Sequence, residues 1–155
     1  MAFIFPAPGV AGVEATLEIE VSGDTSALAI PAMQDITVNN SNDVFTWTQL
    51  DEGSKLQIPT TATNSLELNI VLDQTAFFGD GVSSNVAINK GIFGLSKDKT
   101  LVSFALYLGD TSTGGAGKNL TGTGYITGLA PTASADAPVW VSPCTITVTG
   151  DYTVV

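Results

Sequence analysis

The sequence predicts a mostly β fold: an antiparallel β-sandwich with one short flanking helix and a long protruding loop. Two observations predict the strands. Apolar and polar residues alternate with period two through most of the chain, and turn-forming residues separate the alternating runs. A third observation predicts the helix, because only residues 83–95 break this rhythm. At 155 residues we expect a single domain, 1–155.

The first strands come early in the chain. Residues 13–21 alternate between an apolar face and a polar face that carries Glu18 and Glu20. Residues 34–38 repeat the pattern over a shorter span. Both segments are typical of strands that bury one side only.

A protruding loop or hairpin is predicted at residues 39–60. Its first strand places Phe45 and Trp47 on one face and threonines on the other. Proline cannot donate to a strand ladder, so we expect Pro59 to end the returning strand. The predicted elements are a strand at 44–50, a turn at 51–53 and a strand at 55–58.

The second half of the chain continues the strand pattern on both sides of the helix. Residues 65–73 alternate, with Glu67 on the polar side. The helix within 83–95 has Ser83 or Ser84 as candidate caps. The remaining strands are predicted at 101–108, 125–129 and 145–154.

The charged residues exclude several classes of function. The chain has fifteen carboxylates, five lysines, no arginine and no histidine, and a formal charge of -10. Histidine is the usual general base near neutral pH, and nucleic-acid binding depends mainly on Lys and Arg contacts to phosphate. Charged residues make up only 13% of the chain, against a usual ~25%. The composition therefore favours a structural building block whose surface is covered by partners.

We predict no catalytic, cofactor or metal site. A Ser-His-Asp nucleophile cannot be built without histidine. Asp80 with Asp73 or Asp98 lacks the spacing of a calcium loop, and we interpret these residues as solvated turn carboxylates. The lone Cys144 is expected to be a buried thiol. No apolar run reaches the ~20 residues of a membrane span, so we expect no membrane insertion.

The last third of the chain resembles the major tail tube proteins of long-tailed, non-contractile bacteriophages. The resemblance is carried by four pieces in order: LVSFALYL at 101–108, LTGTGYITGL at 120–129, ADAP at 135–138 and CTITVTG at 144–150. The layout before residue 101 agrees with it. The apolar arm at 1–12 and the absence of arginine are not family hallmarks.

The resemblance implies a function as well as a fold. Six-membered rings, whose inner sheets join into a β-barrel lumen, would stack into a hollow tube that conducts double-stranded DNA without catalysis or cofactor. The implied partners are further copies of the chain, the tape measure and the terminator. The implied location is the virion tail, after assembly in the host cytoplasm.

Seven residues are candidates for these roles, each with an alternative interpretation. Glu18, Glu20 and Glu67 would line the lumen, or belong to an ordinary solvated strand face. Phe45 and Trp47 would contact a neighbouring subunit, or pack on their own sheet. The last two candidates are in the arm, which would dock on a neighbour or fray: Phe3 and Phe5.

A different class of protein fits the same strand pattern. A monomeric β-sandwich binding module, such as a carbohydrate-binding module or an adhesin head, would present exposed aromatic residues as a platform. The chain offers two tryptophans and three tyrosines for such a surface. Self-assembly discriminates between the two hypotheses.

Overall fold

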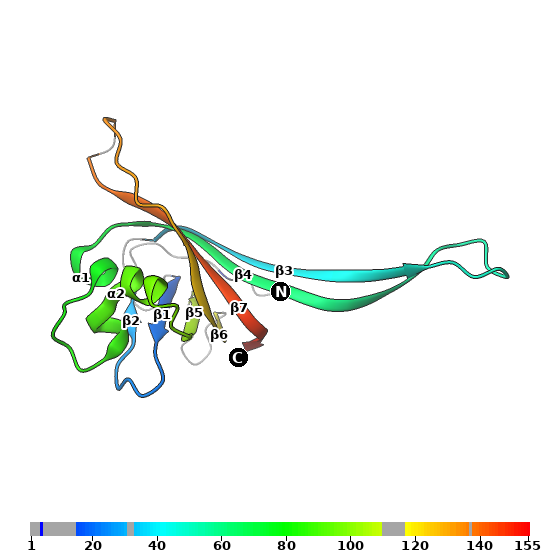
Figure 1. The fold of residues 1–155 in the computed structure, drawn as a ribbon, viewed down its shortest axis with the longest axis horizontal. Helices are drawn as coiled ribbons and strands as arrows, with labels where there is room; N and C mark the ends of the chain where they lie inside the picture. The colour runs from blue at the N-terminus through cyan, green and yellow to red at the C-terminus, as the bar shows by residue number, and fades with distance from the viewer. Residues whose placement is uncertain (1–3, 5–14, 31–32, 110–116, 137) are drawn as a thin grey trace.

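The computed structural model describes residues 4, 15–30, 33–109, 117–136 and 138–155. Its strands form one antiparallel sheet of seven strands in the order β2-β1-β5-β6-β7-β4-β3. Figure 1 shows the sheet with both helices on one side and a long two-stranded extension on the other. The strands are β1 (Thr16–Glu20), β2 (Leu28–Ala29), β3 (Met33–Trp47), β4 (Leu56–Val71), β5 (Val102–Leu108), β6 (Lys118–Leu129) and β7 (Val141–Val154).

The prediction of a mostly β, antiparallel fold is confirmed, and two details differ from it. The described strands belong to one continuous sheet where we expected two facing sheets, because β7 pairs with β6 on one side and with β4 on the other. The helical region contains two helices where we expected one: α1 (Gln74–Phe78) and α2 (Val86–Lys97). The turn at Gly79 separates them.

The core lies between one face of the sheet and the two helices. Period-two alternation places one set of strand side chains on this face, as in β7, where Cys144, Ile146 and Val148 are buried. The helices contribute Phe77, Ile92 and other apolar side chains to the same cluster. One face of the sheet is therefore buried in an apolar core, and the opposite face is available to solvent or to partners.

The helices begin at carboxylates that cap them. Asp73 accepts hydrogen bonds from the amides of Thr75 and Ala76 at the start of α1. The start of α2 is not capped by Ser83 or Ser84 as predicted. The carboxylate of Asp24, far away in sequence, accepts from the first two amides of α2 instead. Neither helix is long and apolar enough to span a membrane, within the described residues.

Gly91 produces a kink in α2. Its φ of 65° is left-handed, and a Cβ at this position would lie 2.4 Å from the backbone nitrogen of Gly79. Only glycine fits this approach without displacing backbone. The close approach packs the turn after α1 against α2.

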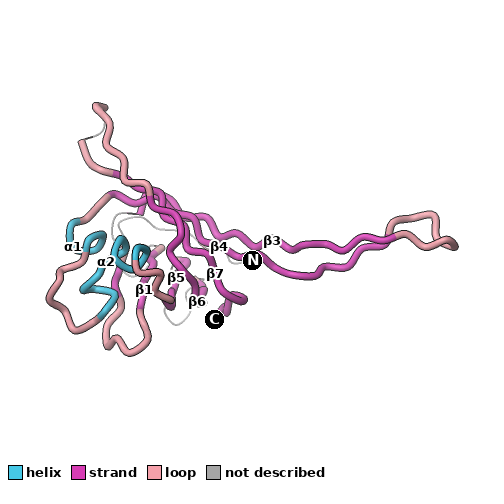
Figure 2. The backbone as a smooth tube through the Cα atoms, in the orientation of Figure 1, coloured by secondary structure: helices cyan, strands magenta, loops and turns pink. Residues whose placement is uncertain are grey.

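The β3–β4 hairpin extends far beyond the rest of the sheet, as Figure 2 makes clear. β4 pairs with β7 only over Ser65–Val71, whereas β3 and β4 remain paired out to Trp47 and Leu56. We call residues 40–64 the outer hairpin. Its paired strands beyond the sheet are about 27 Å long, at ~3.4 Å per residue.

The prediction that Pro59 ends a strand is wrong. β4 runs through Pro59, which pairs with Val44 beside an irregularity in the register between Asn42 and Val44. Proline is tolerated where a ladder is interrupted by a bulge or has a free edge, and the outer hairpin offers both.

A polar cluster secures the hairpin where it leaves the sheet. Asn64 is buried, and its side-chain amide donates to the carbonyl of Gly150 at 2.9 Å. The hydroxyl of Tyr152 lies 2.8 Å from the carbonyl oxygen of Asn39 and 2.9 Å from that of Ser65. The end of β7 thereby holds both strands of the hairpin at its root.

Candidate functional site

The face of the sheet opposite the helices is polar along six strands. We call it the polar face. Strand register places its side chains in adjacent rows, since Glu18 pairs with Ala105, Ser103 with Thr123, and Glu67 with Thr145. The members of this face that carry a hydroxyl, amide or carboxylate are Glu18, Glu20, Asp35, Thr37, Asn39, Ser65, Glu67, Asn69, Ser103, Tyr107, Thr121, Thr123, Tyr125, Thr127, Thr145, Thr147 and Thr149.

All three predicted lumen glutamates lie on the polar face. Glu18 and Glu20 are on β1, and Glu67 is on β4, four strands away in the sheet order. At ~4.8 Å between neighbouring strands, the two groups are about 19 Å apart. The negative charge is therefore spread across the face and is not gathered into one cluster.

The sequence interpretation missed a fourth carboxylate on this face. Asp35 sits opposite Asn69, whose side-chain amide donates to both of its carboxylate oxygens at 3.0 and 3.1 Å. The available pattern was the alternation around Ile36, which packs against the core, since the residues on either side of a core-facing position point to the other face.

Lysine is absent from the polar face as far as the structure describes it. Lys55 is in the outer hairpin, and Lys90, Lys97 and Lys99 belong to α2 and the turn after it. Lys118 starts β6 on the same side as the core residue Leu120. The face thus presents negative charge and hydroxyls without a cation to hold a polyanion.

Hydroxyl groups form rows between the carboxylates. The hydroxyls of Thr127 and Thr147 are 2.8 Å apart across β6 and β7. Thr121 and Thr123 each donate to a carbonyl of β7 at 3.4 Å. These threonine hydroxyls hydrogen-bond to one another or to backbone carbonyls, so they make a polar surface. None of them is paired with a side chain that could activate it as a base or nucleophile.

The carboxylates considered for calcium have other partners. The side chain of Asp80 accepts from the amides of Val82 and Ser83, and these bonds lower its pKa. Lys90 donates to Asp98 at 2.6 Å, and that bond is the main reason the pKa of Asp98 is lowered. The described residues contain no group of three His, Cys, Asp or Glu arranged to hold a metal.

The outer hairpin has one apolar face. Phe45 pairs with Ile58 and Trp47 with Leu56, so four apolar side chains share a side of the ribbon. The rings of Phe45 and Trp47 stack with centroids 5.8 Å apart. Phe45 is nevertheless 57% exposed, because none of the described strands or helices lies behind the ribbon.

Three other residues were singled out from the sequence: Phe3, Phe5 and Cys144. Phe3 and Phe5 lie outside the described residues. Cys144 is buried as expected, and burial raises the pKa of its thiol to about 12. The sequence interpretation gave no attention to an exposed aromatic group on the helix side, formed by Phe78, Phe93 and Trp140.

Comparison with known proteins identifies the fold through structure alone. No protein-family model matches the sequence, and no curated protein matches it either. Solved structures do match. A chain in the tail of an empty gene transfer agent particle, refined with C6 symmetry, has a TM-score of 0.65 at 10% identity, covering 89% of this chain and 92% of that one.

Two further structures have the same arrangement. A chain of the anti-feeding prophage baseplate, 6-fold symmetrised, gives a TM-score of 0.65 at 11% identity and covers 97% of both chains. The SPP1 tail tube protein gives 0.62 at 12% identity, covering 90% of this chain and 76% of that one. These likenesses establish a fold that recurs in tails, tail tubes and baseplates.

Proposed function

We propose that this chain, which has the fold found in tail tubes, is a structural subunit of a bacteriophage tail tube. Copies would polymerise into a hollow, acidic conduit for delivery of double-stranded DNA. One observation carries the proposal: a sheet face of carboxylates and hydroxyls lies opposite a helix-covered core, and the described part of this face has no lysine.

The polar face suits the wall of a DNA channel for an electrostatic reason. Duplex DNA carries one negative charge per ~1.7 Å of axis, and lysines that reach it bind by releasing counterions. Glu18, Glu20, Glu67 and Asp35 repel the passing polyanion. The DNA would therefore slide through without specific binding, and no chemical step is required of the protein.

The edges of the sheet support closure into a ring. β3 is an edge strand 15 residues long, and the opposite edge is β2, with 2 residues. A long unpaired edge is a liability in a monomer, and pairing with a neighbouring subunit removes it. Six copies would give a six-fold ring with a continuous inner barrel.

The outer hairpin supports contact between subunits. An isolated two-stranded hairpin is marginally stable at best in water, and its apolar side needs cover. We propose that Phe45 and Trp47 lie against a neighbouring subunit. We extend the same role to Phe3 and Phe5 in the N-terminal arm, because an apolar arm is stabilised by docking on a neighbour.

Other tail proteins complete the proposal. Head-to-tail contacts produce a polymer with two open ends. A terminator protein would close one end, and a tape measure protein inside the lumen would set the length. The resemblance of residues 101–150 supports the non-contractile class of tail, with assembly in the host cytoplasm and residence in the virion.

Electron microscopy of the purified protein tests the proposal. Negative-stain images at high protein concentration should contain hollow tubes or rings, and averaged cross-sections should have a central channel. Sedimentation that finds only a monomer, both with an assembly initiator and in material released from virions, would contradict it.

A further inference from the structure

A second apolar surface lies on the helix side of the molecule. A groove of about 450 Å³ is lined by Leu72, Asp73, Gln74, Phe78, Pro131, Val139 and Trp140. Phe78 and Trp140 are each 56% exposed, and the Phe78 ring lies 5.8 Å from that of Phe93, which is also exposed. We call this surface, Phe93 included, the aromatic groove. Large aromatic side chains gathered at one exposed site are characteristic of protein contacts.

Lysines flank the aromatic groove on one side. Phe93 and Lys97 are four residues apart on α2, after the kink at Gly91, and so lie on the same side of the helix. Lys90 lies one turn before Gly94 on α2, and its side chain runs past that glycine, where an added Cβ would lie 2.9 Å from the Cβ of Lys90.

Lys99 is exposed just beyond the helix. The carboxylate of Asp98 pairs with Lys90 and leaves Lys97 and Lys99 as excess positive charge. Residues 90–99 thus carry a net charge of +2 in a chain of charge -10, while Asp73, which lines the groove, caps the start of α1.

The outer hairpin has the complementary properties. Its apolar face carries Phe45 and Trp47, and its tip carries Asp51 and Glu52 together with Lys55, for a net charge of -1. A fully covered aromatic side chain removes ~150–250 Å² from water. Phe45 is 57% exposed and Trp47 is already partly buried, so docking this pair would cover roughly 100–200 Å² of the ~800 Å² per partner in a standard interface. Leu56 and Ile58 on the same face add to that area.

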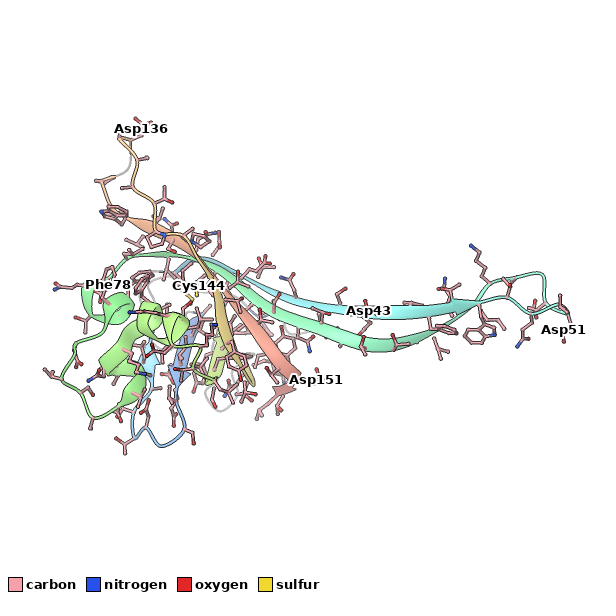
Figure 3. The ribbon with its side chains drawn as sticks, in the orientation of Figure 1. Asp43, Asp51, Phe78, Asp136, Cys144 and Asp151 are labelled. Atoms are coloured by element: carbon pink, nitrogen blue, oxygen red, sulfur yellow. The ribbon has the colours of Figure 1, made fainter. Side chains whose placement is uncertain are left out.

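The two surfaces cannot meet within one subunit. Figure 3 places Asp51 at the far end of the hairpin and Phe78 at the opposite end of the molecule. A projection at one end and a hollow at the other make a heterologous contact, which is satisfied only by a second copy and repeats along a polymer.

We propose that the outer hairpin of one subunit docks over the aromatic groove of a second copy. Phe45 and Trp47 pack against Phe78 and Trp140, and the acidic tip lies beside Lys97 and Lys99. This contact rests on the proposed self-assembly and names the surface that receives the hairpin.

Charge reversal tests the contact. Lys97→Glu with Lys99→Glu should raise the critical concentration for polymerisation, as should Asp51→Lys with Glu52→Lys. Each exposed ion pair contributes a factor of about 1.4–5 to an equilibrium constant, so losing two pairs gives roughly 2- to 30-fold. Combining all four substitutions should restore assembly, because the charges pair again with reversed signs.

The control is Lys118→Glu, one Lys-to-Glu change at the start of β6 and so half the charge change of the double variant, which should leave the critical concentration unchanged. Normal assembly of both double variants would overturn the contact. So would a fourfold variant that assembles no better than either double variant.

Cross-linking supplies an independent measurement. Two subunit populations, one carrying Glu52→Cys and the other Lys97→Cys with an affinity tag, would be mixed, polymerised and treated with a short bis-maleimide. Cys144 is 1% exposed and should stay silent. A tagged dimer is expected from this mixture, and none when Thr123→Cys on the polar face replaces Lys97→Cys.

The two proposals fail differently. Tubes that form normally but give no dimer between positions 52 and 97 would overturn the contact alone. A wild-type chain that never polymerises would overturn the proposed function, and the contact with it.

Discussion

If the polar face lines a DNA channel as proposed, adding lysine to it should make this face bind DNA. The perturbation is Glu20→Lys with Glu67→Lys, two exposed positions on β1 and β4. Each subunit then carries two cations and two remaining carboxylates, Glu18 and Asp35, on this face. Both side chains point away from the core, so the fold and tube assembly should be retained.

The magnitude follows from counterion release. Each phosphate neutralised contributes about -0.9 to the slope of log K against log salt concentration. If one subunit places both lysines on DNA, the slope is about -1.8, and affinity falls about twelvefold between 50 and 200 mM salt. Engagement of further subunits in the ring makes the slope steeper.

The assay is co-sedimentation of assembled tubes with short duplex DNA across this range of salt. Glu20→Gln with Glu67→Gln removes the same carboxylates without adding cations and should retain little DNA. Asp136→Lys places a cation on the exposed loop between β6 and β7, away from the polar face, and controls for binding outside the tube. In reconstituted virions, ejection by the lysine variant should be slower at low salt than at high salt.

The reasoning is refuted if the lysine variant forms normal tubes that bind no more DNA than wild type at 50 mM salt. Ejection at the wild-type rate in low salt would also refute it. Either outcome would mean that Glu20 and Glu67 face away from the DNA, or that wall charge has no influence on its passage.

Four further outcomes are expected. Deleting residues 44–55 should leave a folded monomer that no longer polymerises, and normal tubes from this variant would rule out the outer hairpin as an assembly element. Gly91→Ala should lower the free energy of unfolding in urea by at least about 1 kcal/mol, whereas Gly53→Ala, with open space around it, should not. Burial disfavours the Asp24 carboxylate, but amide hydrogen bonds outweigh this and lower its pKa. Its stabilisation is thus present at neutral pH and lost as pH falls through the folded-state pKa, and Asp24→Asn should cost about 1 kcal/mol at pH 7 and flatten the acid limb of the stability profile. Cys144 should fail to react with a thiol reagent until the protein unfolds, and rapid labelling of the native protein would contradict its burial.

Local patterns were sufficient to predict most of the strands. Alternation in residues 13–21 and 145–154 reports directly which face is buried, because the side-chain period of a strand is two. The sequence could not tell one continuous sheet from two, since that depends on β7 pairing with both β6 and β4 across large sequence separations. The cap of α2 was missed for the same reason: Asp24 lies 62 residues before the amide of Val86.

Some properties of the candidate residues could be predicted from local alternation, and others required the pairing of distant strands. Alternation alone put Glu18, Glu20 and Glu67 on polar sides of their strands. That these sides form one face with Asp35 required the register of the whole sheet. The aromatic groove was beyond sequence reasoning, because Phe78 and Trp140 come from different elements and each alone is typical of a core residue. That Phe45 and Trp47 lie opposite Ile58 and Leu56 required the observed register of β3 and β4.

The charge distribution predicts two salt effects of opposite sign on the proposed assembly. Subunits of charge -10 repel one another, and salt screens that repulsion with a Debye length of ~8 Å at 0.15 M. In the proposed tube, assembly would therefore depend on short-range contacts: strand pairing at the β3 edge and burial of Phe45 and Trp47. Rising salt should promote ring closure by screening the carboxylates of the polar face. In the proposed hairpin contact, the same salt should weaken attraction between the hairpin tip and Lys97 and Lys99, which are exposed on α2 and beyond it. Because aromatic burial is insensitive to screening, the hairpin contact retains its apolar part at high salt. Tubes whose hairpin tips carry Asp51→Asn and Glu52→Asn should consequently lose most of the salt dependence of that contact while still assembling.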